Sequence, residues 1–497
     1  MKGTKSICPE CLKKVEVSIH REKDKIVMKK KCIEHGAFSI PHWQSAKIFD
    51  YAEKFDFFKH YLKKINPNED DDCPFSCGLC EIHLSKTVIA VIDLTKKCDL
   101  NCSICFASFP EYETEYEPDR EEIFRMLEFL SNLDPKPPAV LFSGGEPLLR
   151  EDLPEIICFA HKLGFLTILA TNGIKIAKDP SLAARLKKSG LNIVYLQFDS
   201  LKDDVYIKLR GRKLLKEKLK IIDICRKYDI EVILVPTLIN GLNNDEIGEI
   251  VRFAAKNSYI VRGVVFQPIA FTGKAFNESP IDKWVDYTFA EEVEKQTSGE
   301  VRAEDLFPVP IMTPPIMVMR RFMKKPWPLF SCSPHCGIVN WIYVSKEGRL
   351  IPLNNLLNFK KFFGELLKIS KSINSKGRVQ ILFSLLFAAL KSLNWTIVQR
   401  EVGIFNFFKT VLKVHVSPTY KSLGNIRRRI FLLGCMAFMD RYNFDINRVK
   451  RCVIHYVTPD LKIIPFCAYN NIYRTRVEAE HAKRSLEAKL SFHNLQL

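Results

Sequence analysis

Short apolar runs recur through the middle of the chain, separated by stretches in which apolar residues have helical spacing. Continuous runs of this kind are typical of strands buried on both faces of a parallel sheet, and the amphipathic stretches between them predict covering helices. The runs lie at 87–95, 139–143, 166–171, 193–199, 232–238 and 264–269. The pattern predicts six strand–helix units and therefore an α/β fold, a partial (βα)6 TIM-like barrel of parallel strands.

Two of the expected helices begin with residues that favour helix N-termini. Asp152 precedes Leu-Pro-Glu155, and Asn243 precedes Asn-Asp-Glu246. Asp and Asn side chains accept hydrogen bonds from the unpaired N–H groups of a first helical turn. We therefore expect Asp152 and Asn243 to cap the helices that follow them.

Composition and cysteine spacing narrow the class of protein. The chain has 497 residues, 47% of them apolar and 27% charged, which suggests about three domains and excludes a disordered or collagen-like chain. Several of its 16 cysteines lie three or four residues apart, a spacing that suits metal ions and clusters better than structural disulfides. The chain opens MKGTKSICPE without an apolar leader. We therefore expect a cytoplasmic, reducing compartment and metal-bound thiols.

The chain is strongly basic, with 75 Lys and Arg against 57 Asp and Glu and a net charge of +18. A nucleic-acid surface, an anionic membrane surface or the Lys-rich surface of a thermophile would each explain this excess. The basic residues are spread along the chain without a nucleic-acid-binding motif, so no nucleic-acid partner is expected. No apolar run reaches the roughly 18 residues needed to span a bilayer. We expect a soluble protein or one peripheral to the membrane.

The first cysteine group is a pair of knuckles, each with a two-residue gap. Cys8 and Cys11 form one, and Cys32 and His35 form the other. Three thiolates and one imidazole can hold one tetrahedral ion, and the alternating segment between the knuckles predicts a hairpin. Because all four ligands are supplied, we expect a structural site for zinc or a single iron. The alternative is four unrelated buried residues.

Two later groups share the spacing C-x3-C-x2-C, and their contexts differ. Cys98, Cys102 and Cys105 directly follow the first predicted strand of the barrel, at the strand end where α/β barrels place their chemistry. The earlier group follows the acidic segment NEDDD, with no strand before it. Three thiolates on one short loop can bind three irons of an Fe4S4 cube. The earlier group consists of Cys73, Cys77 and Cys80 and has no obvious fourth thiol; His83 is near, but equally suits a surface position.

The exit of the second barrel strand carries Ser-Gly-Gly-Glu-Pro. Gly144 and Gly145 let the backbone approach a ligand closely, and Glu146, followed by Pro147, offers a carboxylate to an amine. Alone, the motif could be a tight turn. It lies at the strand end next to the Cys98 loop, so the two motifs are expected to converge.

With these two motifs, residues 90–270 resemble the radical S-adenosylmethionine (radical SAM) superfamily. The resemblance implies that Cys98, Cys102 and Cys105 hold a catalytic [4Fe-4S] cluster whose fourth iron binds S-adenosylmethionine. It places Gly144, Gly145 and Glu146 beside the amino group of the methionine moiety. The turn with Thr171 and Asn172, and the strand end with Gln197 and Asp199, occupy positions that contact the ribose and methionine parts. A ferredoxin-like electron donor is implied.

A fourth group lies downstream and joins distant segments. Its members are Cys332, Cys336, Cys452 and Cys467, which could supply all four corners of an auxiliary cluster. Ordinary buried cysteines are the alternative. Cys158 and Cys225 fall within predicted barrel helices, so core packing is expected for them. The prediction is one catalytic and two auxiliary [4Fe-4S] clusters, together with the knuckle ion.

The order of these motifs resembles the archaeal tetraether lipid synthases over most of the chain. That resemblance implies carbon–carbon coupling of unactivated lipid chains at a membrane surface. The apolar block at 379–390, flanked by Lys376 and Lys391, suits a lipid- or membrane-facing helix and equally a buried one. The alternative function is radical modification of a peptide, pterin or other small molecule. A non-catalytic metalloprotein is a third hypothesis, which the paired motifs disfavour.

The expected domain order follows from these groups. A rubredoxin-like or zinc-ribbon-like knuckle is predicted at 1–60, an auxiliary cluster loop at 61–87 and the partial barrel at 88–290. An auxiliary iron–sulfur domain with the apolar insert is predicted to occupy 291–497.

Overall fold

The structure is a computed structural model. It describes residues 3–43, 45–56, 72–78, 80, 83–107, 116–277, 288–323, 326–372, 377–403 and 427–494. The acidic segment before Cys73 lies almost wholly outside the described residues.

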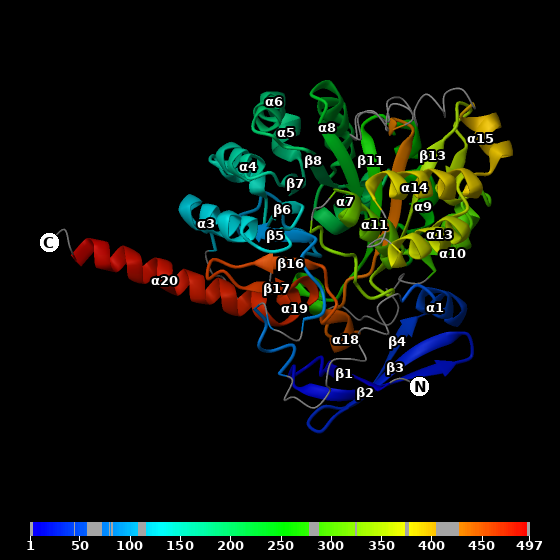
Figure 1. Cartoon of the computed structure of the whole chain (residues 1–497). Coiled ribbons are helices and arrows are strands. Elements are labelled where there is room, and N and C mark those ends of the chain that lie inside the picture. The colour runs from blue at the N-terminus through cyan, green and yellow to red at the C-terminus, as the bar shows by residue number, and fades with distance from the viewer. Residues whose placement is uncertain are drawn as a thin grey trace.

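The N-terminal region is a four-stranded antiparallel sheet with its strands in chain order. Its strands are β1 (Gly3–Ile7), β2 (Lys14–Glu22), β3 (Lys25–Cys32) and β4 (Gly36–Trp43). The hairpin predicted between the two knuckles is confirmed as β2 and β3, which pair from Val17–Lys30 to Glu22–Lys25. Helix α1 (Ala46–Glu53) follows, capped by Ser45. Figure 1 shows this region as a separate blue layer below the main body.

The centre of the molecule is the predicted series of parallel strands, all six of which are confirmed. They are β5 (Ile89–Asp93), β6 (Ala139–Ser143), β7 (Leu166–Thr171), β8 (Ile193–Gln197), β9 (Glu231–Val235) and β11 (Val261–Pro268). Each pairs in parallel with the next, and the short β10 (Thr237–Leu238) pairs with the end of β11. Closure of these strands into a barrel stays a prediction.

Helices between the strands cover the sheet, as the amphipathic pattern predicts (Figure 1). They are α3 (Arg120–Ser131), α4 (Leu153–Lys162), α5 (Ile174–Lys178), α6 (Pro180–Lys188), α7 (Asp203–Arg210), α8 (Leu215–Lys227) and α9 (Ile247–Lys256). Their apolar faces and the strands form the largest core cluster, which includes the fully buried Cys225. Since this cluster excludes water, the polar groups of the site gather at the strand ends.

Asp152 and Asn243 stand at N-cap positions, as predicted, but neither side chain makes the predicted capping bond. Asp152 makes no capping bond to α4, because its carboxylate accepts hydrogen bonds from Arg150 at 2.9 and 2.7 Å. The side chain of Asn243 turns back instead, accepting from the Ile239 N–H at 2.9 Å and donating to the Asp199 carbonyl at 2.9 Å. A neighbour in the chain has taken the carboxylate of Asp152, whereas the Asn243 side chain has gained a long-range partner, the Asp199 carbonyl.

Strands from the C-terminal third extend the same sheet at both edges. At one edge, β15 (Ile430–Met436) runs parallel to β11 and is followed by β13 (Gly337–Val344), which carries the short β12 (Phe307–Pro308) and β14 (Leu350–Pro352). At the other edge, β16 (Ile454–Val457) runs parallel to β5 and pairs with β17 (Ile463–Pro465). The predicted C-terminal domain therefore shares its sheet with the barrel strands, and its boundary stays a prediction.

The remaining helices lie outside this sheet. They are α10 (Phe289–Gln296), α11 (Thr313–Met323), α12 (Leu353–Leu356), α13 (Phe359–Lys371), α14 (Arg378–Ser392), α15 (Trp395–Glu401), α18 (Ile446–Val449), α19 (Phe466–Ala468) and α20 (Arg474–Asn494). Figure 1 shows α20 projecting away from the body. Among the described residues, no helix is both long and apolar enough to cross a membrane.

Candidate functional site

The loop after β5 carries Cys98, Cys102 and Cys105 at the carboxyl end of the sheet. Burial raises the pKa of the Cys105 thiol, and negative charge on Cys102 raises it further. Cys98 lies within electrostatic reach of both other thiols and of Glu146. Burial also raises the pKa of Cys98, so the Cys98 and Cys105 thiols ionise reluctantly unless a positive group joins them, and iron is such a group.

The Gly-Gly-Glu-Pro motif lies directly against this cysteine loop. The Gly145 N–H donates to the Thr95 carbonyl at 2.6 Å, and the Glu146 N–H donates to the Lys97 carbonyl at 2.8 Å. A methyl group on Gly144, where φ is +123°, would lie 2.3 Å from the Thr95 oxygen. One on Gly145 would lie equally close to the Lys97 oxygen. The glycines therefore allow the backbone contact that brings both motifs together.

Glu146 is only 1% exposed, and neighbouring donors hold its carboxylate. It accepts hydrogen bonds from the Thr171 hydroxyl at 2.6 Å, the Asn172 N–H at 2.8 Å and the Leu148 N–H at 3.0 Å. Burial raises the pKa of Glu146 to about 7, while these bonds act in the opposite direction. The structure thus joins the motif at β6 to the Thr171–Asn172 turn after β7. Pro147 begins the short helical turn that follows.

The other residues assigned to S-adenosylmethionine also lie at this end of the sheet. Asn172 donates from Nδ2 to the Asp99 carboxylate at 2.7 Å, inside the cysteine loop. The buried Lys218 of α8 donates to the Asn172 carbonyl at 2.7 Å and to Gln197 Oε1 at 3.1 Å. Burial lowers the pKa of Lys218 to about 8. Contacts from this layer to S-adenosylmethionine stay a prediction.

Asp199 has a partner that the sequence did not indicate. Its two carboxylate oxygens accept hydrogen bonds from Arg210 at 2.8 Å each, and both side chains are buried. Arg210 also donates to the Ile104 carbonyl at 3.3 Å and contacts the Cys102 thiol. Nothing in the local sequence marks Arg210, which ends α7. It connects the end of β8 to the cysteine loop and so positions that loop.

Arg474 is a second positioning residue that sequence reasoning missed. It begins α20 and donates to the Asp93 carboxylate at the end of β5, at 2.6 Å. The guanidinium lies over the rings of Tyr456 and Tyr469, at 5.2 and 4.8 Å from their centroids. Its positive charge reaches Cys105 and lowers the pKa of that thiol against the larger effect of burial.

The fourth cysteine group converges in space, although its members span distant parts of the chain. Cys452 lies within electrostatic reach of Cys467 and Cys336, and Cys332 lies within reach of Cys336 and Cys452. Burial raises the pKa of Cys452 and raises that of Cys467 to about 12. Cys435, in contrast, belongs to the apolar core with Cys225. Four converging thiols are the donor set that an auxiliary cluster needs.

The remaining triad borders a cavity of about 100 Å³. Cys73, Cys77 and Cys80 line it together with His83 from the same segment and His455 from β16. The triad thus lies near β16, which pairs with β5 on the side of the sheet away from β11.

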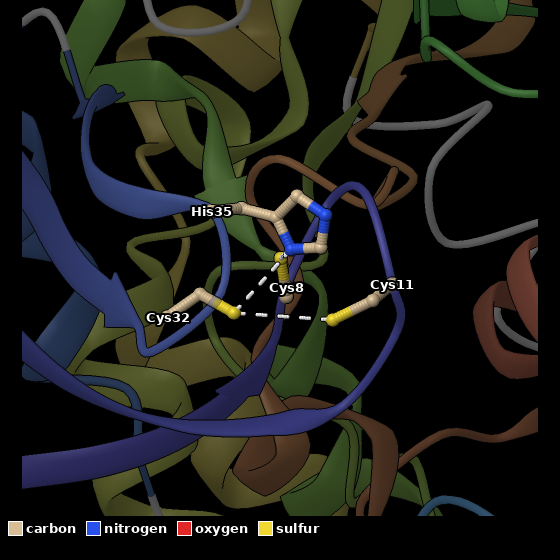
Figure 2. A group of neighbouring side chains, drawn as sticks. All are labelled: Cys8, Cys11, Cys32 and His35. Atoms are coloured by element: carbon tan, nitrogen blue, oxygen red, sulfur yellow. Dashed lines mark hydrogen bonds between the residues drawn. The ribbon is translucent and has the colours of Figure 1, made fainter.

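The N-terminal knuckle has the geometry of a closed site for one ion. The donor atoms of Cys8, Cys11, Cys32 and His35 all lie within 4.8 Å of one another, and Figure 2 shows the four side chains pointing together. The two sulfurs of Cys11 and Cys32 lie 3.9 Å apart, and His35 Nδ1 lies 3.8 Å from the Cys8 sulfur and 3.6 Å from the Cys32 sulfur. Tetrahedral zinc with such ligands gives separations of about 3.6–3.8 Å. The His35 imidazole lowers the pKa of Cys32 to about 6, which favours the metal-binding thiolate.

The knuckle sheet packs against the mouth of the site. Ile40 of β4 shares an apolar cluster with Ile104 of the cysteine loop and with Ile239 and Ile269 at the ends of barrel strands. The sheet is also tied to the C-terminal third, since Lys30 donates to the Arg441 carbonyl at 2.9 Å.

The apolar block at 379–390 forms α14, which has a buried side and an exposed apolar side. Ile381 and Ala388 are buried against α11 and α13. On another face Val379, Phe383 and Phe387 are 66, 67 and 65% exposed. Their spacing of four residues aligns them along one side of the helix.

The chain is similar to known proteins in its sequence. The family model described as the radical SAM superfamily matches residues 92–254, and that of the HMPTM N-terminal zinc ribbon domain matches 1–44. The 7,8-dihydro-6-hydroxymethylpterin dimethyltransferase of Methanocaldococcus jannaschii is 39% identical over 483 residues, 96% of this chain and 95% of that protein. The GTP 3′,8-cyclase of Helicobacter pylori is 32% identical over 35% of this chain and 54% of its own. Streptococcus suis SuiB bound to its precursor peptide SuiA aligns with 59% of this chain and 69% of its own, at 16% identity and a TM-score of 0.37.

Proposed function

The chain belongs to the radical SAM superfamily, and within it to the family of the M. jannaschii pterin dimethyltransferase; we propose that it methylates a reduced pterin by radical chemistry. Membership of the superfamily implies a [4Fe-4S] cluster and S-adenosylmethionine. The observation that carries the substrate is the 39% identity over almost the full length of both chains. The order of the motifs alone favoured lipid coupling, but this identity favours pterin modification.

The donor sets described above fit the implied groups. When bound, a cluster-ligated S-adenosylmethionine supplies a 5′-deoxyadenosyl radical that removes hydrogen from carbon atoms no side-chain acid or base could activate. Cys98, Cys102 and Cys105 are the proposed cluster ligands. Glu146 is proposed to accept hydrogen bonds from the methionine amino group, and Arg210 to hold the cysteine loop in place. A ferredoxin-like protein is the proposed electron donor.

A second candidate is the coupling of lipid chains at a membrane surface. The observation that favours it is the exposed apolar side of α14, formed by Val379, Phe383 and Phe387. Lys360, Lys361 and Lys368 of α13 and Lys391 of α14 are exposed on these two packed helices. An apolar helix side with basic neighbours suits an anionic membrane or an entering acyl chain. A small pterin requires no such surface.

One anaerobic experiment separates the two candidates. The reconstituted, reduced protein is incubated with S-adenosylmethionine and either an extract of a pterin-producing host, which supplies methyl donors, or archaeal lipid extract. We expect 5′-deoxyadenosine and a pterin heavier by one CH2 for each methyl group. A lipid lighter by two hydrogens per coupling, with pterins unchanged, would establish the second candidate instead. Cleavage of S-adenosylmethionine with neither product would contradict both.

Two sets of variants give this experiment its controls. Replacing Cys98, Cys102 and Cys105 together by Ala is expected to abolish 5′-deoxyadenosine formation. If 5′-deoxyadenosine still formed, Cys73, Cys77 and Cys80 would be the ligands of the catalytic cluster instead. The double variant Phe383→Ser and Phe387→Ser is expected to leave pterin methylation unchanged. Leu219→Ser, on an exposed side of α8, is the matched control. Selective loss of a lipid product in the double variant would support lipid coupling.

A further inference from the structure

The thiols of Cys73, Cys77 and Cys80 are spaced differently from the ligands of the knuckle. This difference indicates what kind of metal group the cavity beside them would hold. Among the described residues, only the knuckle brings three or more Cys, His, Asp or Glu donor atoms within 4.8 Å of one another. The three thiols of the triad instead stand around about 100 Å³ of space. Wider spacing around a cavity suits a group of several atoms better than a single ion. Three thiolates leave one corner of a four-iron cube without a protein ligand.

His83 lines the same cavity. Its backbone N–H donates to the Cys80 carbonyl at 3.1 Å, which holds His83 close to the residue that carries the third thiol. Its Nε2 lies 2.9 Å from the Cys452 carbonyl oxygen. A carbonyl oxygen can only accept, so Nε2 carries the hydrogen and Nδ1 keeps its lone pair. Metal-binding histidines commonly have this arrangement, with one nitrogen donating to a backbone carbonyl and the other free for the metal.

His455 provides a second, independent observation. Its Nε2 lies 3.0 Å from His83 Nε2. Because His83 Nε2 carries a hydrogen, a second hydrogen on His455 Nε2 would clash with it, so His455 Nε2 has the lone pair and His455 Nδ1 is protonated. His455 is 2% exposed, and its Nδ1 has no hydrogen-bond partner among the described residues. A buried N–H without an acceptor is costly. Since His455 lines the cavity, the occupant is the natural source of an acceptor, and cluster sulfides accept such bonds.

We propose that Nδ1 of His83 is the fourth protein ligand of an auxiliary [4Fe-4S] cluster held by Cys73, Cys77 and Cys80. His455 is a positioning residue that contacts the cluster through a hydrogen bond. The reverse assignment, with His455 as the ligand, would require a hydrogen on His455 Nε2. His83 Nε2 would then oppose the Cys452 carbonyl with a lone pair at 2.9 Å. The inference does not depend on which substrate the enzyme modifies.

The test uses the full-length protein, with zinc in the knuckle so that His35 gives no paramagnetic signal. Protein labelled with 15N-histidine is reduced without S-adenosylmethionine and studied by pulsed electron paramagnetic resonance. We expect hyperfine coupling to one imidazole nitrogen, identified by its change on labelling. The coupling disappears in His83→Cys, which keeps the same iron and sulfide content because a thiolate replaces the imidazole. It also disappears in His83→Ala, which loses iron more readily on oxidation.

Two further variants complete the design. His455→Ala is expected to retain the coupling with a changed reduction potential, because it removes only the hydrogen bond to the cluster. His20→Ala, on β2 of the N-terminal sheet, leaves signal and potential unchanged. Coupling that survives in His83→Cys, that disappears in His455→Ala, or that is missing from the wild-type protein with its full iron content would overturn the assignment. His83→Cys keeps the test decisive even if His83→Ala fails to fold.

Discussion

Glu146 shows how burial and hydrogen bonding tune a single carboxyl group. The site excludes water from it, and this loss of hydration raises its pKa to about 7. Thr171 and the backbone of Asn172 and Leu148 limit the rise by donating to the charged form. About half of the protein molecules therefore carry an ionised Glu146 near neutral pH, and a cationic ligand would bind to those molecules.

Binding of S-adenosylmethionine should consequently depend on pH. The ionised fraction of Glu146 rises with pH through 7, so we expect the dissociation constant to fall by about fivefold from pH 6 to pH 7. Anaerobic equilibrium dialysis of the cluster-loaded protein measures it. Glu146→Gln cannot ionise and should bind more weakly, with no change over the same interval. An equally steep pH profile in Glu146→Gln would show that another group controls binding.

Arg210 and Asp199 illustrate a different use of charge at the residue scale. Both are buried, so each depends on the other for charge compensation, and removing one partner of such a pair costs about 3–5 kcal/mol. The guanidinium also donates to the Ile104 carbonyl within the cysteine loop. The pair therefore stabilises the loop as well as the end of β8.

At the scale of elements, the important contact is the seam between the loops after β5 and β6. Two backbone hydrogen bonds, Gly145 to Thr95 and Glu146 to Lys97, join the loops. Because neighbouring parallel strands bring their carboxyl ends together, this seam sets the distance between the cysteines and Glu146. This seam leaves no room for a side chain at position 145.

Gly145→Ala should therefore displace the cysteine loop without unfolding the protein. We expect loss of about four irons per chain from the catalytic site, retention of the auxiliary irons, and 5′-deoxyadenosine formation lowered by about a hundredfold. Iron analysis and anaerobic turnover measure these effects. The matched control is Gly364→Ala in α13, where a methyl group meets nothing within 4 Å. Full iron content and normal turnover in Gly145→Ala would show that the seam can shift.

At the scale of the whole molecule, the N-terminal sheet, the barrel strands and the C-terminal third meet around one end of the central sheet. Ile40 shares an apolar cluster with Ile104 of the cysteine loop, while Thr4 bonds to Asp445 and Lys30 to the Arg441 carbonyl. Arg474, at the start of α20, donates a hydrogen bond to Asp93 at the end of β5. Segments from both ends of the chain thus support the loop that carries Cys98, Cys102 and Cys105.

Cys8→Ser tests whether the knuckle ion only stabilises this assembly. We expect one metal equivalent less per chain and a lower melting temperature, because the ion holds the two knuckles of the sheet together. The reaction product should be the same, since the ion has no open position for a ligand. Metal analysis, calorimetry and product analysis by mass spectrometry provide the measurements. A folded Cys8→Ser protein that no longer accepts electrons would identify the ion as a redox relay.

The sequence by itself determined the features that depend on short spacing. Six strands, the β2–β3 hairpin and the knuckle ligands were predictable because neighbours in the chain stay neighbours in space. The apolar pattern marked the strands, and the Cys98 loop and Glu146 were placed together because adjacent parallel strands end at the same edge.

Only the tertiary structure decided the long-range partners. It paired Asp199 with Arg210, joined Arg474 to Asp93, and bonded the Asn243 side chain to the Asp199 carbonyl in place of the helix end that it was expected to cap. It also placed His83 between the Cys452 carbonyl and His455, which changed a residue of open role into a proposed ligand. The physical reason is that such bonds depend on which segments pack together. Their energy comes from burial across the whole fold, which no local pattern records.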